Sequence, residues 1–356
     1  MPSPNKKTVK ITYYSHWGGL LQDAPKYFEQ LPRRDLGPLV SDPSDQALLD
    51  LARLDCDWDG ENLRCFSELS HPEIEFAPTK IVGIAGLLDF LQEEVQPSVI
   101  PWLIMIAQQP QTIESVLDRI LTLFTQKGGK VFYWAYDEAS RYMPCFKEGL
   151  ARHLSVLVHD EMPLDNAVAV DINPACIVHN RSWLANIVPY SYPFVGDVRK
   201  QIVFLGSKLG FTPHRKRQVD YLKQHFKDRF TAIHDHSIPV SQRGEFGRYK
   251  VHFCPEGRTF TTPAMRYTHT DRPFWSGCVG QVPVVEDSKL GGRLQGLTED
   301  GLILRYTNGD LKGMVEACEQ ALETPLEQRK RIYDHFNENE SIGPNVAQMI
   351  AEAVSG

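Results

Sequence analysis

Residues 249–292 hold the densest set of side chains that could bind an anionic ligand bearing hydroxyl groups. Two short apolar runs in this stretch, Val251–Cys254 and Val282–Val285, predict buried strands. Carboxylates accept hydrogen bonds from hydroxyl groups, and guanidinium groups bind phosphate through paired hydrogen bonds. Because ligands bind at the carboxyl edge of an open parallel sheet, the sequence predicts a ligand site at these strand ends. Its charged candidates are Glu256, Arg266, Asp271, Arg272 and Glu286.

A second basic group precedes this stretch. The strand predicted at Gln201–Leu205 runs into a Gly-rich turn that holds Lys208, and a helix with Arg215 and Arg217 near its start follows. Helix N-terminal amides and Arg side chains bind oxyanions without a metal ion, so these residues are candidates for contacting phosphate. Each candidate has a structural alternative. These are an exposed helix face for Arg215, a surface ion pair for Arg272, a helix N-cap for Asp271, and a water-facing turn for the two glutamates.

The composition excludes several classes of protein. The 356 residues are 42% hydrophobic and 23% charged, as in soluble globular proteins, and a net charge of −7 argues against a general nucleic-acid or membrane-surface binder. No apolar run reaches the roughly 18 residues that cross a bilayer, and the N-terminal residues lack the apolar core of a secretory signal. The seven scattered cysteines favour reduced thiols in a cytoplasmic protein. His234 and His236 lack an evident third ligand, so we expect no metal site.

Strands and helices alternate along the chain, which is typical of α/β architecture. Apolar residues recur at helical spacing in Thr112–Gln126, and two glycines separate this helix from a strand at Lys130–Trp134. Residues 1–9 are expected to form a tail before a strand at Lys10–Ser15. Other strands are expected at Lys80–Ala85, Leu154–His159, Ala175–His179, Phe230–Ile233 and Leu302–Tyr306, and other helices at Met143–His153, His214–Phe226, Asp271–Cys278, Asp310–Leu322, Pro325–Phe336 and Ile342–Ala353.

This alternation of strands and helices predicts two Rossmann-like α/β domains that face a central cleft. The N-terminal domain is expected to span residues 1–195 and the C-terminal domain residues 196–340. A C-terminal helix in residues 341–356 is expected to pack back on the N-terminal domain.

The second half of the chain resembles the donor-binding domain of glycosyltransferases with the two-Rossmann, or GT-B, fold. Two families share its pattern, the exostosin-type transferases and the fucosyltransferases of the α1,3 type. The residues that match the exostosin pattern are Phe253-Cys254-Pro255-Glu256-Gly257, Arg266, Asp271, Gly277-Cys278 and Pro283-Val284. Those that match the fucosyltransferase pattern are Glu256-Gly257, Thr270-Asp271-Arg272, Trp275 and Val282-Pro283-Val284-Val285. The resemblance covers roughly residues 200–330, with Asp271-Arg272 in place of a Glu-Lys pair.

The resemblance implies a hexosyl- or deoxyhexosyltransferase that moves a sugar from a nucleotide-diphosphate donor to a carbohydrate or other hydroxyl acceptor. It implies an inverting reaction that needs neither a metal nor another cofactor. Arg272 stands where these families bind phosphate, and Asp271 stands where they bind the ribose hydroxyls. The fold draws the catalytic base, which takes the acceptor's proton, from the N-terminal domain. The candidates, each of which follows a predicted strand and has a polar loop residue as its alternative, are His16, Asp137, Glu138 and the pair Asp160-Glu161. Of these, His16, Asp137 and Glu138 are favoured.

Other classes of function stay open at this point. An epimerase or phosphorylase on the same fold would also bind a sugar nucleotide or sugar phosphate, and a non-catalytic binding protein could have kept the fold. Charges that converge at strand ends argue against a scaffold. The absence of G-x-G-x-x-G after either opening strand disfavours an NAD-dependent oxidoreductase. The sequence leaves the donor's base and sugar, the acceptor and the oligomeric state undetermined.

Overall fold

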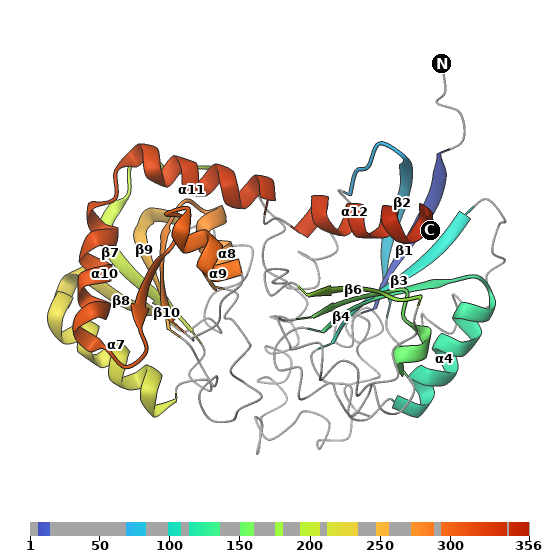
Figure 1. The fold of residues 1–356 in the computed structure, drawn as a ribbon, viewed down its shortest axis with the longest axis horizontal. Helices are drawn as coiled ribbons and strands as arrows, with labels where there is room; N and C mark the ends of the chain where they lie inside the picture. The colour runs from blue at the N-terminus through green and yellow to red at the C-terminus, as the bar shows by residue number, and fades with distance from the viewer. Residues whose placement is uncertain are drawn as a thin grey trace, which may run out of the picture. The chain divides into compact units, whose positions relative to one another are not determined.

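A computed structural model of the chain describes residues 6–14, 69–82, 99–107, 114–135, 150–159, 175–180, 193–206, 212–233, 247–255, 272–287, 293–339 and 342–355. The chain divides into two compact units (Figure 1). Unit 1 comprises Met1–Asn180 and Gly343–Gly356, and unit 2 comprises Arg181–Ile342. The domain boundary near residue 196 stays a prediction, because residues 181–192 lie outside the described part of the chain.

The described part of unit 1 forms a parallel sheet of six strands in the order β2-β1-β3-β4-β5-β6. The strands are β1 (Lys7–Tyr14), β2 (Ile74–Val82), β3 (Val99–Ala107), β4 (Lys130–Ala135), β5 (Val156–His159) and β6 (Ile177–Asn180). The helix α4 (Glu114–Gln126) connects β3 to β4, as its apolar spacing predicted. The expected helix at Met143–His153 is described only at its end, as a short 3₁₀ turn over Leu150–His153.

One expectation for unit 1 is wrong, and one strand is missing from the expected elements. Residues 7–9 are the beginning of β1 rather than part of a tail. The run Val99–Ala107, for which no element is expected from the sequence, is β3, and Trp102 and Leu103 on it are fully buried. Strands inside a parallel sheet are buried on both faces, so they read as continuous apolar runs without alternation. Pro101 also argues against a strand at this place in the sequence, because proline is rare inside sheets.

Helix α12 (Ile342–Ser355) belongs to unit 1 over nearly its whole length (Figure 1). It buries Val346, Met349 and Ile350. The amine of Lys7 donates a hydrogen bond to the carbonyl of Val354 at 2.7 Å, which ties the helix to the start of β1.

Unit 2 contains a second parallel sheet, with five described strands in the order β11-β10-β9-β7-β8. These strands are β7 (Arg199–Leu205), β8 (Phe230–Ile233), β9 (Tyr249–Cys254), β10 (Val282–Asp287) and β11 (Leu304–Thr307). Its helices are α7 (Pro213–Phe226), α8 (Arg272–Cys278), α9 (Arg293–Glu299), α10 (Leu311–Glu323) and α11 (Leu326–Asn339). The sequence predicts all of these strands and helices except α9, whose single apolar turn gives little periodicity.

The two sheets share one connection order. In each, the first strand lies between the second and the third: β1 lies between β2 and β3, and β7 lies between β8 and β9. Connections leave in opposite directions from such a point, and the crevice at the carboxyl ends of the strands is where α/β sheets bind ligands. The carboxyl ends of β7, at Leu205, and of β9, at Cys254, therefore mark the expected ligand edge of unit 2.

Buried thiols line the core of unit 2. Cys254 is fully buried and Cys278 is 1% exposed, so both are core residues. Burial raises the pKa of the Cys278 thiol, so this group stays protonated and unreactive at neutral pH. No helix in the described ranges is long and apolar enough to cross a membrane.

The contact between α8 and α11 gives a first prediction. Phe274 and Phe336 meet edge to face at 6.1 Å between ring centroids, and Gly277 lies beneath the Phe336 ring so closely that an added Cβ would overlap it. Replacing Gly277 by Ala should lower the free energy of unfolding by about 1–3 kcal/mol, because a packed core resists extra volume. Urea unfolding measures this change.

The matched control is Gly296→Ala in α9, where no described atom lies within 4 Å of the added Cβ. This change should be neutral or stabilise by up to about 1 kcal/mol, because alanine favours helix over glycine. Equal destabilisation by the two variants would contradict the packing argument.

Candidate functional site

The first turn of α7 is fixed by its cap. Thr212 has extended backbone dihedral angles, and its hydroxyl accepts a hydrogen bond from the Arg215 amide at 3.2 Å. Pro213 follows at the first helical position, where its missing N–H costs nothing. The Thr-Pro pair thus starts the helix at a defined residue and sets the direction of His214 and Arg215.

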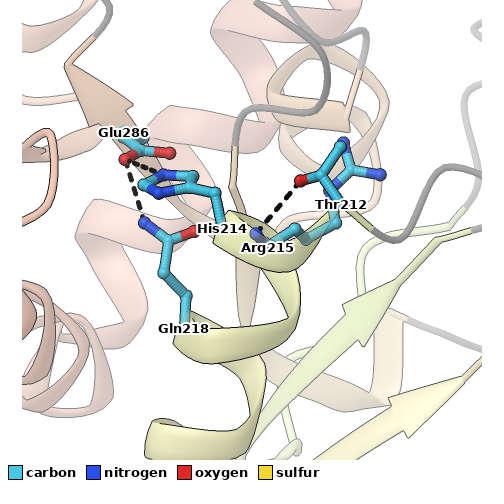
Figure 2. Close-up of polar contacts among 5 residues, drawn as sticks. All are labelled: Thr212, His214, Arg215, Gln218 and Glu286. Carbon is cyan, nitrogen blue, oxygen red and sulfur yellow. Dashed lines mark hydrogen bonds and ion pairs between the residues drawn. The ribbon is translucent and has the colours of Figure 1, made fainter. Parts of the chain in front are cut away.

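A buried carboxylate meets this turn. Glu286 lies near the end of β10, and one of its oxygens accepts two hydrogen bonds, at 2.7 Å from His214 Nε2 and at 2.9 Å from Gln218 Nε2 (Figure 2). A carboxylate only accepts, so Nε2 of His214 carries a proton. His214 and Gln218 are four residues apart and therefore share one face of the helix.

The position of Glu286 follows from the apolar strand that precedes it. Val284 and Val285 are fully buried, and β10 pairs with strands on both sides. The strand carries Glu286 into the same buried layer, where the residue is 1% exposed. A buried carboxylate requires hydrogen-bond donors, which His214 and Gln218 supply. The water-facing alternative for Glu286 is therefore wrong.

Arg215 is 5% exposed, so the exposed-face alternative is wrong for this residue as well. The alternative does describe its neighbours Lys216 and Arg217, which are exposed. Figure 2 shows the Arg215 side chain pointing away from Glu286, on the side of Thr212. Of these three consecutive basic residues, Arg215 is therefore buried in the interior, whereas Lys216 and Arg217 face water.

Arg272 is the first residue of α8 and lies at the expected ligand edge. Its Nε donates a hydrogen bond at 2.7 Å to the carbonyl of Leu205, the last residue of β7. Helix α8 follows β9 in the chain, whereas Leu205 ends the neighbouring strand β7. The bond therefore links the ends of two adjacent strands, at the point of the sheet where the connections after them leave in opposite directions. The side chain is half-buried, and the carbonyl fixes one edge of the planar guanidinium group.

No protein-family model and no curated protein matches this chain. Among solved structures, the trehalose-6-phosphate phosphatase N-terminal domain of Candida albicans is similar at a TM-score of 0.50 and 7% identity, over 99% of this chain and 97% of that one. The chain has the GT-B fold. The predicted pair of Rossmann-like α/β units is thus confirmed, while the central cleft stays a prediction.

Two further structures are similar at lower scores. One is a structure of trehalose-6-phosphate from E. coli bound with UDP-2-fluoro glucose, with a TM-score of 0.44 and 10% identity over 97% of this chain and 98% of that one. The other is the lipopolysaccharide outer core galactosyltransferase WaaB, with a TM-score of 0.43 and 11% identity over 98% and 99%. Likeness at this identity concerns the fold alone, so the resemblance to exostosin-type and fucosyltransferase families stays a prediction.

The structure describes four of the candidates from the sequence, namely Arg215, Arg217, Arg272 and Glu286. The others lie outside the described residues: Lys208, Glu256, Arg266, Asp271, His16, Asp137, Glu138, Asp160 and Glu161. Two members of the Glu286 cluster, His214 and Gln218, were not predicted to be functional. Their spacing on one helix face was the available signal, but nothing local to the sequence indicates that this face meets β10. Among the described residues, no three His, Cys, Asp or Glu side chains gather as metal ligands do.

Proposed function

We propose that the protein is a glycosyltransferase that moves a sugar from a nucleotide-diphosphate donor to a hydroxyl acceptor. The supporting observation is the buried Glu286, held by His214 and Gln218 at the carboxyl edge of unit 2. A buried charged cluster is costly for a protein to maintain, so its presence at a ligand edge favours a role in binding. The GT-B fold is consistent with this assignment but does not carry it.

The proposed donor fits the groups at this edge. A leaving diphosphate carries negative charge, which cationic side chains and helix N-terminal amides stabilise without a metal ion. Arg272 is the proposed diphosphate contact, and the first turn of α7, which holds Arg215, is the proposed helix end. Of the residues outside the described ranges, Lys208 and Arg266 are proposed to add positive charge, and Glu256 and Asp271 to bind sugar and ribose hydroxyls.

The proposed reaction is an inverting transfer. The acceptor oxygen forms a bond to the anomeric carbon while the bond from that carbon to the phosphate oxygen breaks. The electron pair of the broken bond leaves with the diphosphate. A base takes the acceptor's proton, and the proposed bases are His16, Asp137 and Glu138. The described strands β1 and β4, which precede these residues in the chain, end at the same edge of the unit 1 sheet.

A thermal-shift panel of UDP-, GDP-, ADP-, CMP- and dTDP-sugars tests the proposal. One nucleotide family should raise the melting temperature, because a ligand at a hundredfold excess over its dissociation constant adds about 2.7 kcal/mol of stability. A chelator should leave the shift unchanged. Release of the free nucleotide only when acceptor is present would favour transfer over an epimerase. If no sugar nucleotide shifts the folded protein, the proposal fails and a non-catalytic binding protein is favoured.

A further inference from the structure

We infer that the side-chain oxygen of Gln218 accepts a hydrogen bond from a hydroxyl group of the nucleotide sugar, an inference that rests on the proposed function. Gln218 lies in the second turn of α7, beside the carboxylate of Glu286 (Figure 2). It is 1% exposed, and its Oε1 accepts no hydrogen bond from any group in the described part of the chain. Buried polar atoms are nearly always satisfied, so this oxygen calls for a hydrogen-bond donor that these residues do not supply.

The contact with Glu286 fixes the orientation of the Gln218 amide. Its Nε2 donates to the carboxylate at 2.9 Å, and a carboxylate only accepts hydrogen bonds. Exchanging the nitrogen and the oxygen of the amide would therefore place two acceptors against each other. In Figure 2 the oxygen points away from the carboxylate, on the side of His214. The same contact that uses the amide nitrogen thus leaves Oε1 as an acceptor.

The chemistry of this acceptor selects the group that can bind it. An ionised phosphate is excluded, because it has no proton to donate to an amide oxygen. A divalent metal ion is disfavoured, since Mg²⁺ and Ca²⁺ take roughly six or more ligands and Gln218 supplies one oxygen. A hydroxyl group needs a single acceptor for its proton. Hydroxyl groups are present on both the ribose and the sugar of a nucleotide sugar, so a hydroxyl is the group of the proposed ligand that fits here.

The cluster of His214, Gln218 and Glu286 presents one member to solvent. The side chain of His214 is 32% exposed, whereas that of Glu286 is 0% exposed. Because the Gln218 oxygen lies on the side of His214, a ligand reaches it beside the imidazole rather than past the carboxylate. A buried acceptor of this kind discriminates for a hydroxyl, because an analogue without that hydroxyl leaves the oxygen unpaired.

Calorimetric titration of the wild type tests the first step, with the nucleotide sugar that gives the largest thermal shift and with its single-deoxy analogues. One set of analogues lacks a hydroxyl of the ribose, and the other lacks a hydroxyl of the sugar. At least one analogue should bind about three- to tenfold more weakly than the complete ligand, which corresponds to loss of one neutral hydrogen bond. The analogue that shows the loss identifies whether the ribose or the sugar supplies the hydroxyl.

The same titrations with Gln218→Met test whether this hydroxyl contacts Gln218. Methionine fills much of the space but has no amide oxygen, so the variant should bind that analogue and the complete ligand with affinities within about twofold of each other. Methionine also removes the hydrogen bond to Glu286. A purely structural effect of that loss would weaken both ligands by the same factor and preserve the preference for the hydroxyl.

The same helix offers a matched control. Gln224 lies on α7 but is exposed, so Gln224→Met makes the same chemical change away from the cluster. This variant should retain the wild-type preference for every hydroxyl of the ligand.

The outcomes separate the inference from the proposed function. A folded Gln218→Met variant that keeps every wild-type preference would overturn the inference while the proposed function stands. A wild type whose affinity depends on the base but on no hydroxyl would also overturn it, whether or not the variant folds. A wild type that binds no sugar nucleotide would overturn both.

Discussion

Replacing Arg329 by methionine is expected to lower the free energy of unfolding by about 2–4 kcal/mol. Arg329 is 1% exposed, and its guanidinium group donates to the carbonyls of Gly280 at 3.0 Å, Gly196 at 3.2 Å and Val195 at 3.0 Å. The group also lies 5.3 Å from the centre of the Phe194 ring. Methionine would fill much of the space but leave three carbonyls without their donor.

The expected loss is smaller than the sum of the three hydrogen bonds. Burial lowers the pKa of Arg329, which shows that the protein bears a cost for holding this charge away from water. Methionine removes that cost together with the bonds. The remaining loss of unfolding free energy comes mainly from the Gly280 carbonyl, which is buried and cannot exchange its lost donor for water.

Urea unfolding of the full chain measures this stability, and hydrogen exchange over residues 193–206 reports on the segment that Arg329 holds. The neighbouring Lys330 is half-exposed and pairs with Asp334 one turn away, so Lys330→Met should cost less than about 1 kcal/mol. Arg329→Lys keeps the charge but not the forked set of donors, so its loss of unfolding free energy should lie between those of Arg329→Met and Lys330→Met. A loss no larger in Arg329→Met than in Lys330→Met would refute the assigned role.

Replacing Arg272 by alanine is expected to weaken binding of the nucleotide sugar by about 10–100-fold, if the proposed function is right. The bond from Nε to the Leu205 carbonyl orients the planar guanidinium group at the carboxyl end of β7. Charge-assisted contacts of an oriented guanidinium with phosphate contribute about 1.5–3 kcal/mol. Alanine removes both the charge and the orientation.

Calorimetric titration with the nucleotide sugar found in the thermal-shift panel measures the loss. Arg217→Ala provides the control, because Arg217 carries the same charge on α7 but is exposed. The affinity of Arg217→Ala for the nucleotide sugar should stay within about twofold of that of the wild type, since exposed charges are screened by salt. Arg272→Lys should recover part of the affinity through its charge alone. Equal losses in Arg217→Ala and Arg272→Ala would indicate a general effect of net charge and remove Arg272 from the site.

Much of the fold could be predicted from the sequence because its signals are local. Helical spacing predicted α4, α7, α10 and α11 to within a few residues, and short apolar runs predicted most strands. The exceptions have physical reasons. Strand β3 is buried on both faces and contains Pro101, so it shows neither alternation nor the usual strand composition.

The candidate site could be predicted only in part. The sequence by itself determined that Glu286 ends a buried strand and that a helix begins near Pro213 with a run of basic residues. It did not determine that these two places meet. His214 and Glu286 are 72 residues apart, and β9 lies between β7 and β10 in the sheet. The order of strands in space, which depends on long-range packing rather than local periodicity, brings the first turn of α7 to the end of β10. The same packing buries Arg215 but leaves Lys216 and Arg217 in water, because helix rotation relative to the sheet decides which side chains face inward.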